Sequence, residues 1–230
     1  MSTSSSSSSS SAQQILAILH SVLDEFGSRL NIHGGSRILV SDTSLAQALY
    51  ELTEPVRTPF GPTLTVASQE QPDTSQVSHI PNATVLAADQ LAMDHYTHAV
   101  FGVSGEDPKY IFGGIKHMIS ALRPKGYAVI VALKRETKQV SSGSGSSASS
   151  AAAAGEGGGA EGGEGEFQVS LDDKMKYQSK GRINHLEDAL YYAGFERGRV
   201  KKLEDKKAVV DGVDVEAQVF LAMKWDQLTA

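Results

Sequence analysis

Apolar and polar positions between residues 96 and 133 predict a strand, an amphipathic helix and a second strand in succession. The helix is predicted over residues 108–122, and residues 127–133 form a seven-residue apolar run rich in β-branched side chains. Between them, Leu-Arg-Pro-Lys-Gly at residues 122–126 predicts a tight turn. An apolar run of this length after a helix is typical of a strand buried on both faces of a parallel sheet. This part of the chain therefore predicts an α/β fold.

The same patterns recur along the rest of the chain. Apolar residues from Ile15 to Phe26 recur at helical spacing and predict an opening helix that ends at Gly27. Further strands are predicted at residues 37–40, 64–67, 84–87 and 98–103, and further helices at residues 45–52 and 183–193. A strand at residues 199–203 or 208–210 and a last strand at residues 217–225 complete the pattern. Because strands alternate with helices, we expect right-handed crossovers and a mainly parallel sheet.

Two low-complexity stretches interrupt this pattern. Residues 2–11 consist of Ser and Thr, so we expect a disordered head over residues 1–11. Residues 141–166 contain only Ser, Gly, Ala and Glu, which predicts a disordered insertion at about residues 138–168. Strand patterns lie on both sides of the insertion. We therefore expect one domain, residues 12–230, and the composition of these stretches indicates a eukaryotic protein.

Composition excludes several classes of function. The formal net charge of -6 opposes non-specific attraction to phosphate backbones, so we expect no nucleic-acid partner. The chain has no cysteine, which excludes disulfides, thiolate nucleophiles and Cys-ligated metals and suits a reducing compartment. No apolar stretch approaches the roughly 18 to 20 residues that cross a bilayer, and a secretory signal pattern is absent. We expect a cytoplasmic protein without membrane contact.

Three local sequences resemble the class I S-adenosylmethionine-dependent methyltransferases. The turn at residues 122–126 is similar to the LRPGG-like turn before the fifth strand of that family, with Lys125 in place of a glycine. Ala-Gly-Phe at residues 193–195 resembles the turn after its penultimate helix, and residues 220–225 resemble its last strand. The resemblance covers roughly residues 37–133 and 183–225. It implies a Rossmann-like, mainly parallel seven-stranded sheet flanked by helices, with an antiparallel C-terminal edge strand.

The resemblance implies S-adenosylmethionine as cofactor, bound at the carboxyl ends of the strands. In the family, a glycine-rich turn after the first strand lets the backbone approach the methionine moiety. Here residues 39–46 read Leu-Val-Ser-Asp-Thr-Ser-Leu-Ala without a glycine, so this motif is degenerate. Asp42 has two readings, as a ligand for the cofactor amine or as the cap of the following helix.

The loops after the second and third strands carry the next implied cofactor residues. The acid that bonds the ribose at the end of the second strand is shifted or lost here, with Glu70 as its substitute. After the third strand, Asp89 and Gln90 are similar to the family motif whose carboxylate accepts a hydrogen bond from the adenine amine. Asp89 is the residue that the resemblance assigns most readily to a ligand, and a loop or cap role is the alternative.

The loop after the fourth strand is where the family gathers the substrate and the methyl group. Ser104 is the implied cofactor contact in this loop, and Glu106 or Asp107 can act as a base toward a hydroxyl or amine. The alternative is that Asp107 only begins the next helix, ahead of a proline at its first position. His98 and His117 are further candidates for a base. We expect no metal site, because no metal-ligand motif accompanies the histidines.

Two functions remain open from the sequence. The first is a methyltransferase acting on a small-molecule metabolite. The second is a non-methylating pseudo-methyltransferase that serves as a scaffold or partner subunit, or catalyses another reaction in a reshaped pocket. The missing glycines favour the second function, while the third-strand and fifth-strand features indicate a shared architecture. The expected partner is accordingly a small-molecule substrate or another protein.

Overall fold

An eight-stranded sheet forms the centre of the structure, a computed structural model that describes residues 6–53, 61–68, 74–103, 108–134, 171–210 and 213–225. The elements, with η marking a short 3-10 helix, are α1 (Ser6–Leu30), β1 (Arg37–Val40), α2 (Thr43–Leu52), β2 (Thr63–Ser68), η2 (Thr74–Val77), β3 (Ala83–Ala87), η3 (Ala88–Gln90), β4 (Tyr96–Val103), α3 (Pro108–Ala121), β5 (Leu122–Lys134), α4 (Leu171–Gln178), α5 (Leu186–Ala193), η4 (Arg197–Arg199), β6 (Val200–Lys202), β7 (Lys206–Val210) and β8 (Val213–Met223).

The strand order is β3-β2-β1-β4-β5-β8-β6, and β7 pairs with β8 beside β6. Strands β1 to β5 are parallel to one another, whereas β8 runs antiparallel to β5, β6 and β7. The antiparallel strand thus lies one position inside the edge that β6 and β7 form. This arrangement confirms the mainly parallel, Rossmann-like sheet with an antiparallel C-terminal strand that the sequence predicts.

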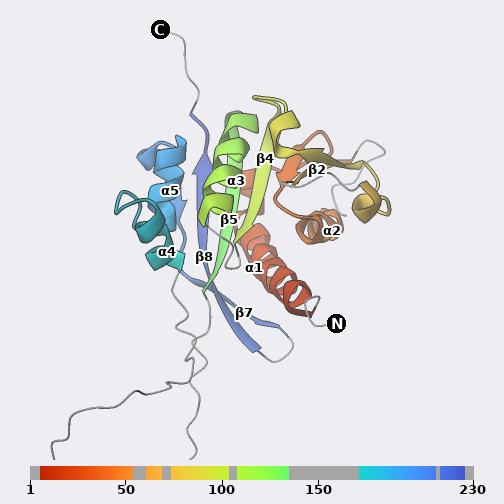
Figure 1. The fold of residues 1–230 in the computed structure, drawn as a ribbon. Helices are drawn as coiled ribbons and strands as arrows, with labels where there is room; N and C mark the ends of the chain where they lie inside the picture. Colours follow the sequence, from red (N-terminus) through yellow and green to blue (C-terminus); the bar gives the residue numbers. More distant parts are fainter. Residues whose placement is uncertain are drawn as a thin grey trace, which may run out of the picture.

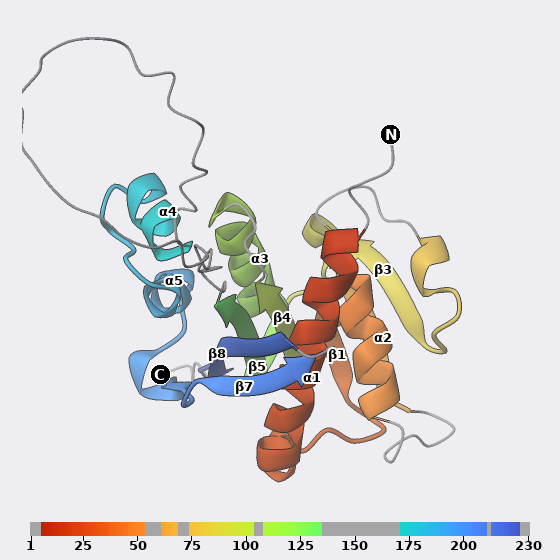
Figure 2. The same cartoon turned by 90° about the horizontal axis from the view of Figure 1, so that it is seen from below.

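Helices cover both faces of the sheet (Figures 1 and 2). Helices α1 and α2 lie on one face, and α3, α4 and α5 lie on the other. Alternate residues of β1 show the two cores: Ile38 and Val40 pack with Leu45 of α2, while Leu39 packs with Ile115 of α3. Every residue of β4 is buried, as a central strand between two helical layers requires.

Helix α1 is longer at both ends than the sequence predicts. It begins at Ser6, so residues 6–11 are helical where we expected a disordered head, and residues 1–5 lie outside the described part. It also continues through Gly27, because Leu30 one turn further is buried and extends the apolar face. The helix ends at Asn31, whose φ of 51° is the left-handed conformation that terminates helices.

The region after residue 170 contains two helices where one was predicted. Helix α5 begins at Leu186, three residues later than the apolar spacing indicates, because the Asp188 carboxylate accepts the backbone N–H groups of Asn184 and His185 at 3.1 and 3.2 Å. Gly194, with φ of 116°, ends α5 as predicted. Helix α4 was not predicted, since its sequence is mostly polar.

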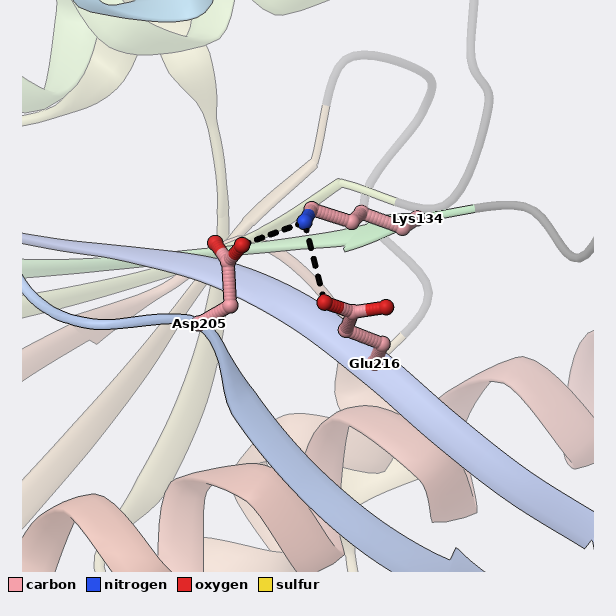
Figure 3. A network of polar contacts seen from close by, with 3 residues as sticks. All are labelled: Lys134, Asp205 and Glu216. Atoms are coloured by element: carbon pink, nitrogen blue, oxygen red, sulfur yellow. Dashed lines mark hydrogen bonds and ion pairs between the residues drawn. The ribbon is translucent and has the colours of Figure 1, made fainter.

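Both alternatives for the penultimate strand occur, as β6 and β7, which is why the sheet has eight strands and not seven. Between them Leu203 is buried, and its N–H still donates to the Val219 carbonyl at 2.9 Å. Lys134 at the end of β5 bonds to Asp205, which lies between β6 and β7, and to Glu216 on β8 (Figure 3). Its Nζ lies 2.5 Å from Asp205 Oδ2 and 3.0 Å from Glu216 Oε1. The hydrogen bonds to Asp205 and then Glu216 raise the pKa of Lys134.

The predicted insertion falls within residues 135–170, which lie outside the described residues. The strands on its two sides pair directly, from Tyr127 opposite Met223 to Lys134 opposite Glu216. Both flanks of the insertion therefore belong to one sheet. Among the described residues, no helix has the length and apolar character to cross a membrane.

Candidate functional site

The carboxyl ends of β1 to β4 meet at one edge of the sheet, the edge that Figure 2 views. The strand order reverses between β1 and β4, because the chain steps outward to β2 and β3 before it returns to β4. In open α/β sheets, ligands bind at such a reversal, outside the carboxyl ends of the strands. This edge is therefore where a functional site is expected.

A small cavity of about 20 Å³ lies at this edge, between the strands and α3. Its walls include Ser41 after β1, Ala67 on β2, Ala88 on η3, Phe101 on β4, and Tyr110, Gly114, His117 and Met118 on α3. The enclosed space holds about one water molecule, whereas ligand pockets usually enclose roughly 300 to 1,000 Å³. The space that the described residues enclose here is therefore too small to be a preformed ligand pocket.

Ser41 and Asp42 make the whole connection between β1 and α2, and both side chains bond to the protein itself. The Ser41 hydroxyl accepts the N–H of Gly102 at 3.0 Å and donates to Asp42 Oδ2 at 3.1 Å. Asp42 Oδ1 accepts the N–H of Leu45 at 2.9 Å. Of the two readings of Asp42, the structure shows the helix cap, and its role toward a ligand stays a prediction.

Apolar side chains fill the space beside this connection. A Cβ atom at Gly102 would lie 3.0 Å from Ile15 Cδ1 and 3.1 Å from Leu45 Cδ1, so the absence of a side chain at Gly102 is what lets α1 and α2 pack here. Ile15 and Leu45 are both buried. This close packing lies on the α1 and α2 side of the sheet, whereas Ser41 lines the small cavity on the α3 side.

Asp89 and Gln90 lie at the same edge, in η3 directly after β3. Both side chains are exposed, and the neighbouring Ala88 lines the cavity. The structure thus brings Asp89 and Asp42 to one edge of the sheet, as the sequence implies, while it leaves Asp89 open to solvent.

Three of the predicted site residues, Ser104, Glu106 and Asp107, lie outside the described residues, as does Glu70. The chain is described up to the end of β4 at Val103 and again from the start of α3 at Pro108. The roles of these residues as cofactor contact and base stay predictions.

His98 lies away from this edge, which corrects the expectation that it acts as a base. It occupies the amino-terminal part of β4, between Ile38 of β1 and Tyr127 of β5. Its side chain is buried, with Nε2 2.7 Å from the Leu30 carbonyl and Nδ1 2.8 Å from the Thr97 hydroxyl. Burial lowers the pKa of His98, so the imidazole is neutral and both nitrogens are engaged inside the protein.

His117 and Tyr110 are the titratable side chains of the cavity wall, both on α3. Sequence analysis predicted His117 as a candidate base but did not identify Tyr110 as a residue of the candidate site. The two residues lie seven positions apart, which is two helical turns, so they share one side of α3 next to the cavity, where Tyr110 is half-buried and His117 is exposed. That spacing is the signal that would have identified Tyr110. Within the described part of the chain, no group of three or more potential metal ligands occurs.

Comparison with known proteins identifies the class of fold. No protein family matches the sequence, and no curated protein matches it. Among solved structures, the 1,6-didemethyltoxoflavin-N1-methyltransferase of Burkholderia thailandensis, determined with bound 1,6-didemethyltoxoflavin and S-adenosylhomocysteine, has a TM-score of 0.51 at 11% identity, over 92% of this chain and 79% of that one.

Two further structures are similar at lower scores. A SAM-dependent methyltransferase from Aquifex aeolicus has a TM-score of 0.47 at 14% identity, over 88% of this chain and 87% of that one. A possible exported protein from Bordetella parapertussis has a TM-score of 0.45 at 11% identity over 90% of this chain, which spans 66% of the length of that protein. At these identities the likeness is one of fold, and the structure has a class I methyltransferase-like fold.

The residues at the end of β1 do not fit S-adenosylmethionine in the way that the resemblance implies. A glycine-rich turn would let a ligand lie against the backbone, but here α2 begins at Thr43, directly after Ser41 and Asp42. Hydrogen bonds within the protein engage both of these side chains. In this chain, two side chains that bond within the protein thus stand where the family has its glycine turn.

Proposed function

We propose that this protein uses the methyltransferase-like fold without transferring methyl groups, and that it acts as a partner subunit of another protein. The connection between β1 and α2, which has no glycine and whose side chains bond within the protein, carries this proposal. Ser41 and Asp42 bond to the protein itself, and Ile15 and Leu45 occupy the space beside Gly102. Opening this junction would break the cap of α2 and uncover buried apolar surface, so a bound cofactor would have to offset both costs.

A methyltransferase acting on a small-molecule metabolite is the second candidate. The position of Asp89 favours it, because this exposed carboxylate stands at the carboxyl edge beside the cavity. The structural neighbour from Burkholderia thailandensis, with bound S-adenosylhomocysteine, has the same fold. Substrate binding would then use the α3 wall, where Tyr110 and His117 line the cavity.

Calorimetric titration with S-adenosylmethionine and S-adenosylhomocysteine distinguishes the two candidates. We expect no saturable binding of either compound at millimolar concentration, since the glycine turn that would let the methionine end of the cofactor approach the backbone is missing. Saturable micromolar binding of both compounds would overturn the proposal.

A pair of variants decides whether any binding observed uses the implied site. If the methyltransferase candidate is correct, Asp89→Ala should weaken binding by about tenfold or more, the usual effect of losing a hydrogen bond to a charged group. Asp214→Ala, at an exposed position on the β7–β8 hairpin, is the matched control and should leave binding unchanged. Equal effects of both variants would show that Asp89 has no specific role.

A further inference from the structure

A second hollow lies at the opposite end of the sheet, where β5 begins and β8 ends. It is a groove of about 420 Å³ between the last turn of α1, the short helix η4 and the edge strand β6. We call it the Arg29–Trp225 groove, after the residues on two of its sides. Its volume lies within the range of roughly 300 to 1,000 Å³ that small-molecule sites enclose.

The floor of the Arg29–Trp225 groove is one face of the sheet. Tyr127 pairs with Met223 across β5 and β8, and Lys201 pairs with Leu221 across β6 and β8. Paired residues point to the same face, and so do residues two positions apart on one strand, such as Leu221 and Met223. The floor is therefore apolar and aromatic, and the ammonium of Lys201 beside it lies 5.5 Å from the centre of the Phe26 ring of α1.

Three cations surround this floor. Arg29 is exposed on the last turn of α1, and Lys201 is exposed on β6. The guanidinium of Arg199 stands 4.3 Å from the centre of the Trp225 ring and is held there by Glu196, with Arg199 Nε 3.3 Å from Glu196 Oε2. Among the groove residues, only Glu196 opposes these charges, although the whole chain has a net charge of -6. The groove is thus locally cationic on an acidic protein.

We propose that the Arg29–Trp225 groove binds a small ligand that joins a planar ring to a phosphate, of the nucleoside monophosphate class. The Trp225 ring is 44% exposed, and aromatic side chains bind nucleobases by stacking. Arg29 and Lys201 both line the groove, with Lys201 Nζ 5.5 Å from the centre of the Phe26 ring on α1, and they attract a phosphate dianion through charge-assisted hydrogen bonds. This inference does not depend on the proposed function, because the groove and the carboxyl edge share no residue.

Trp225 is the only tryptophan of the chain, so its fluorescence reports on this groove directly. We would titrate the full-length protein with AMP, and in parallel with adenosine and with inorganic phosphate, at constant ionic strength. The expected result is a saturable change in Trp225 emission with AMP at a concentration at least about tenfold lower than with adenosine or phosphate, since AMP alone engages ring and cations together. No saturable change with AMP, or equal responses to AMP and adenosine, would overturn the proposal.

Two adjacent lysines provide a matched pair of variants. Lys201 faces the groove, whereas Lys202 pairs with Phe220 and therefore points to the opposite face of the sheet. Lys201→Ala should weaken AMP binding by about tenfold, and Arg29→Ala should do the same, while Lys202→Ala should leave it unchanged. Each of these side chains is exposed, so folding should be retained. An equal loss of affinity in Lys201→Ala and Lys202→Ala would show non-specific attraction and overturn the site.

Discussion

His98 joins the first helix to the centre of the sheet through a single buried ring. Its Nε2 lies 2.7 Å from the Leu30 carbonyl, which can only accept, so Nε2 carries the hydrogen and Nδ1 is the acceptor nitrogen of a neutral imidazole. The Thr97 hydroxyl, which also accepts the Arg37 N–H at 2.9 Å, lies 2.8 Å from Nδ1. Protonation of His98 would place a charge among these groups without water to stabilise it.

The buried position of His98 predicts a loss of stability in mild acid. The pKa of His98 is lowered in the folded protein, mainly by burial, so below pH 6.5 the unfolded chain binds a proton that the folded chain does not. The free energy of unfolding should fall as pH decreases through 6.5, by up to about 1.4 kcal/mol per pH unit for this one proton, and level off below the folded pKa. In His98→Gln this component should be absent, which urea unfolding at a series of pH values would measure.

Replacing His98 also changes the free energy of unfolding by an amount that does not depend on pH. The comparison near pH 8 serves as the reference for this amount, because His98 is neutral there in the folded and in the unfolded state. The difference between parent and His98→Gln should be largest there and should shrink as the pH falls. Parallel curves for the two proteins over the whole range would contradict this account of His98.

At the scale of single residues, contacts between neighbours in the sequence can be predicted, whereas contacts between distant residues cannot. The cap by Asp42 is visible in the sequence because its partner, Leu45, lies three positions away. The partner of His98 lies 68 positions away at Leu30, so no local pattern indicated that the ring is buried. His98 was named as a candidate base from its chemistry alone, and the structure shows that its side chain is buried.

The first residues of β5, at positions 122–126, contain two neighbours with opposite requirements. Lys125 adopts φ of 62°, a conformation that a side chain disfavours, and its N–H donates to the Lys224 carbonyl at 3.0 Å. At Gly126 the φ angle is not the constraint, but a Cβ atom would lie 2.9 Å from the Arg123 carbonyl and from the Leu122 side chain. Glycine is therefore favoured at the first position by conformation and required at the second by space.

Substitutions at these two positions should change stability in opposite directions. Lys125→Gly should raise the free energy of unfolding by about 1 kcal/mol, because it relieves the left-handed conformation. Gly126→Ala should lower it by about 1 to 3 kcal/mol, because the added methyl group forces the turn apart. Thermal and urea unfolding of the two variants beside the parent would measure both effects. A destabilised Lys125→Gly would mean that the lysine side chain matters more to this turn than its backbone.

Elements were predicted well where one periodic apolar face determines them and poorly where tertiary contacts set their limits. The spacing of apolar residues correctly indicated α1, α2, α3 and α5 and the buried strands β4 and β5. The end of α1 was misplaced because Gly27 resembles a stop, whereas the burial of Leu30 continues the helix. Asp205, between β6 and β7, bonds to Lys134, which lies 71 positions away in the sequence, so no local pattern indicated this contact.

For the whole molecule, we predict that the low-complexity insertion contributes little to stability. Replacing residues 141–166 with a short Gly/Ser linker should change the free energy of unfolding by less than about 1 kcal/mol, because the cost of closing a loop rises only slowly with its length. A melting curve would measure the shift. As a control, a variant that also lacks α4 should melt several degrees lower, since Met175 of α4 is fully buried. A large loss of stability in the first variant would show that the insertion is part of the folded structure.

The antiparallel position of β8 has a consequence for the order in which the chain folds. β5 lies between β4 and β8, so during synthesis one side of this apolar strand has no partner until residues 213–223 have left the ribosome. The backbone N–H and C=O groups along that side are then available to strands of other nascent chains. Pairing across so long a separation in sequence is slow, because the search for the partner precedes any gain in contacts. The last strand made thus covers the side of β5 that would otherwise remain open to other chains.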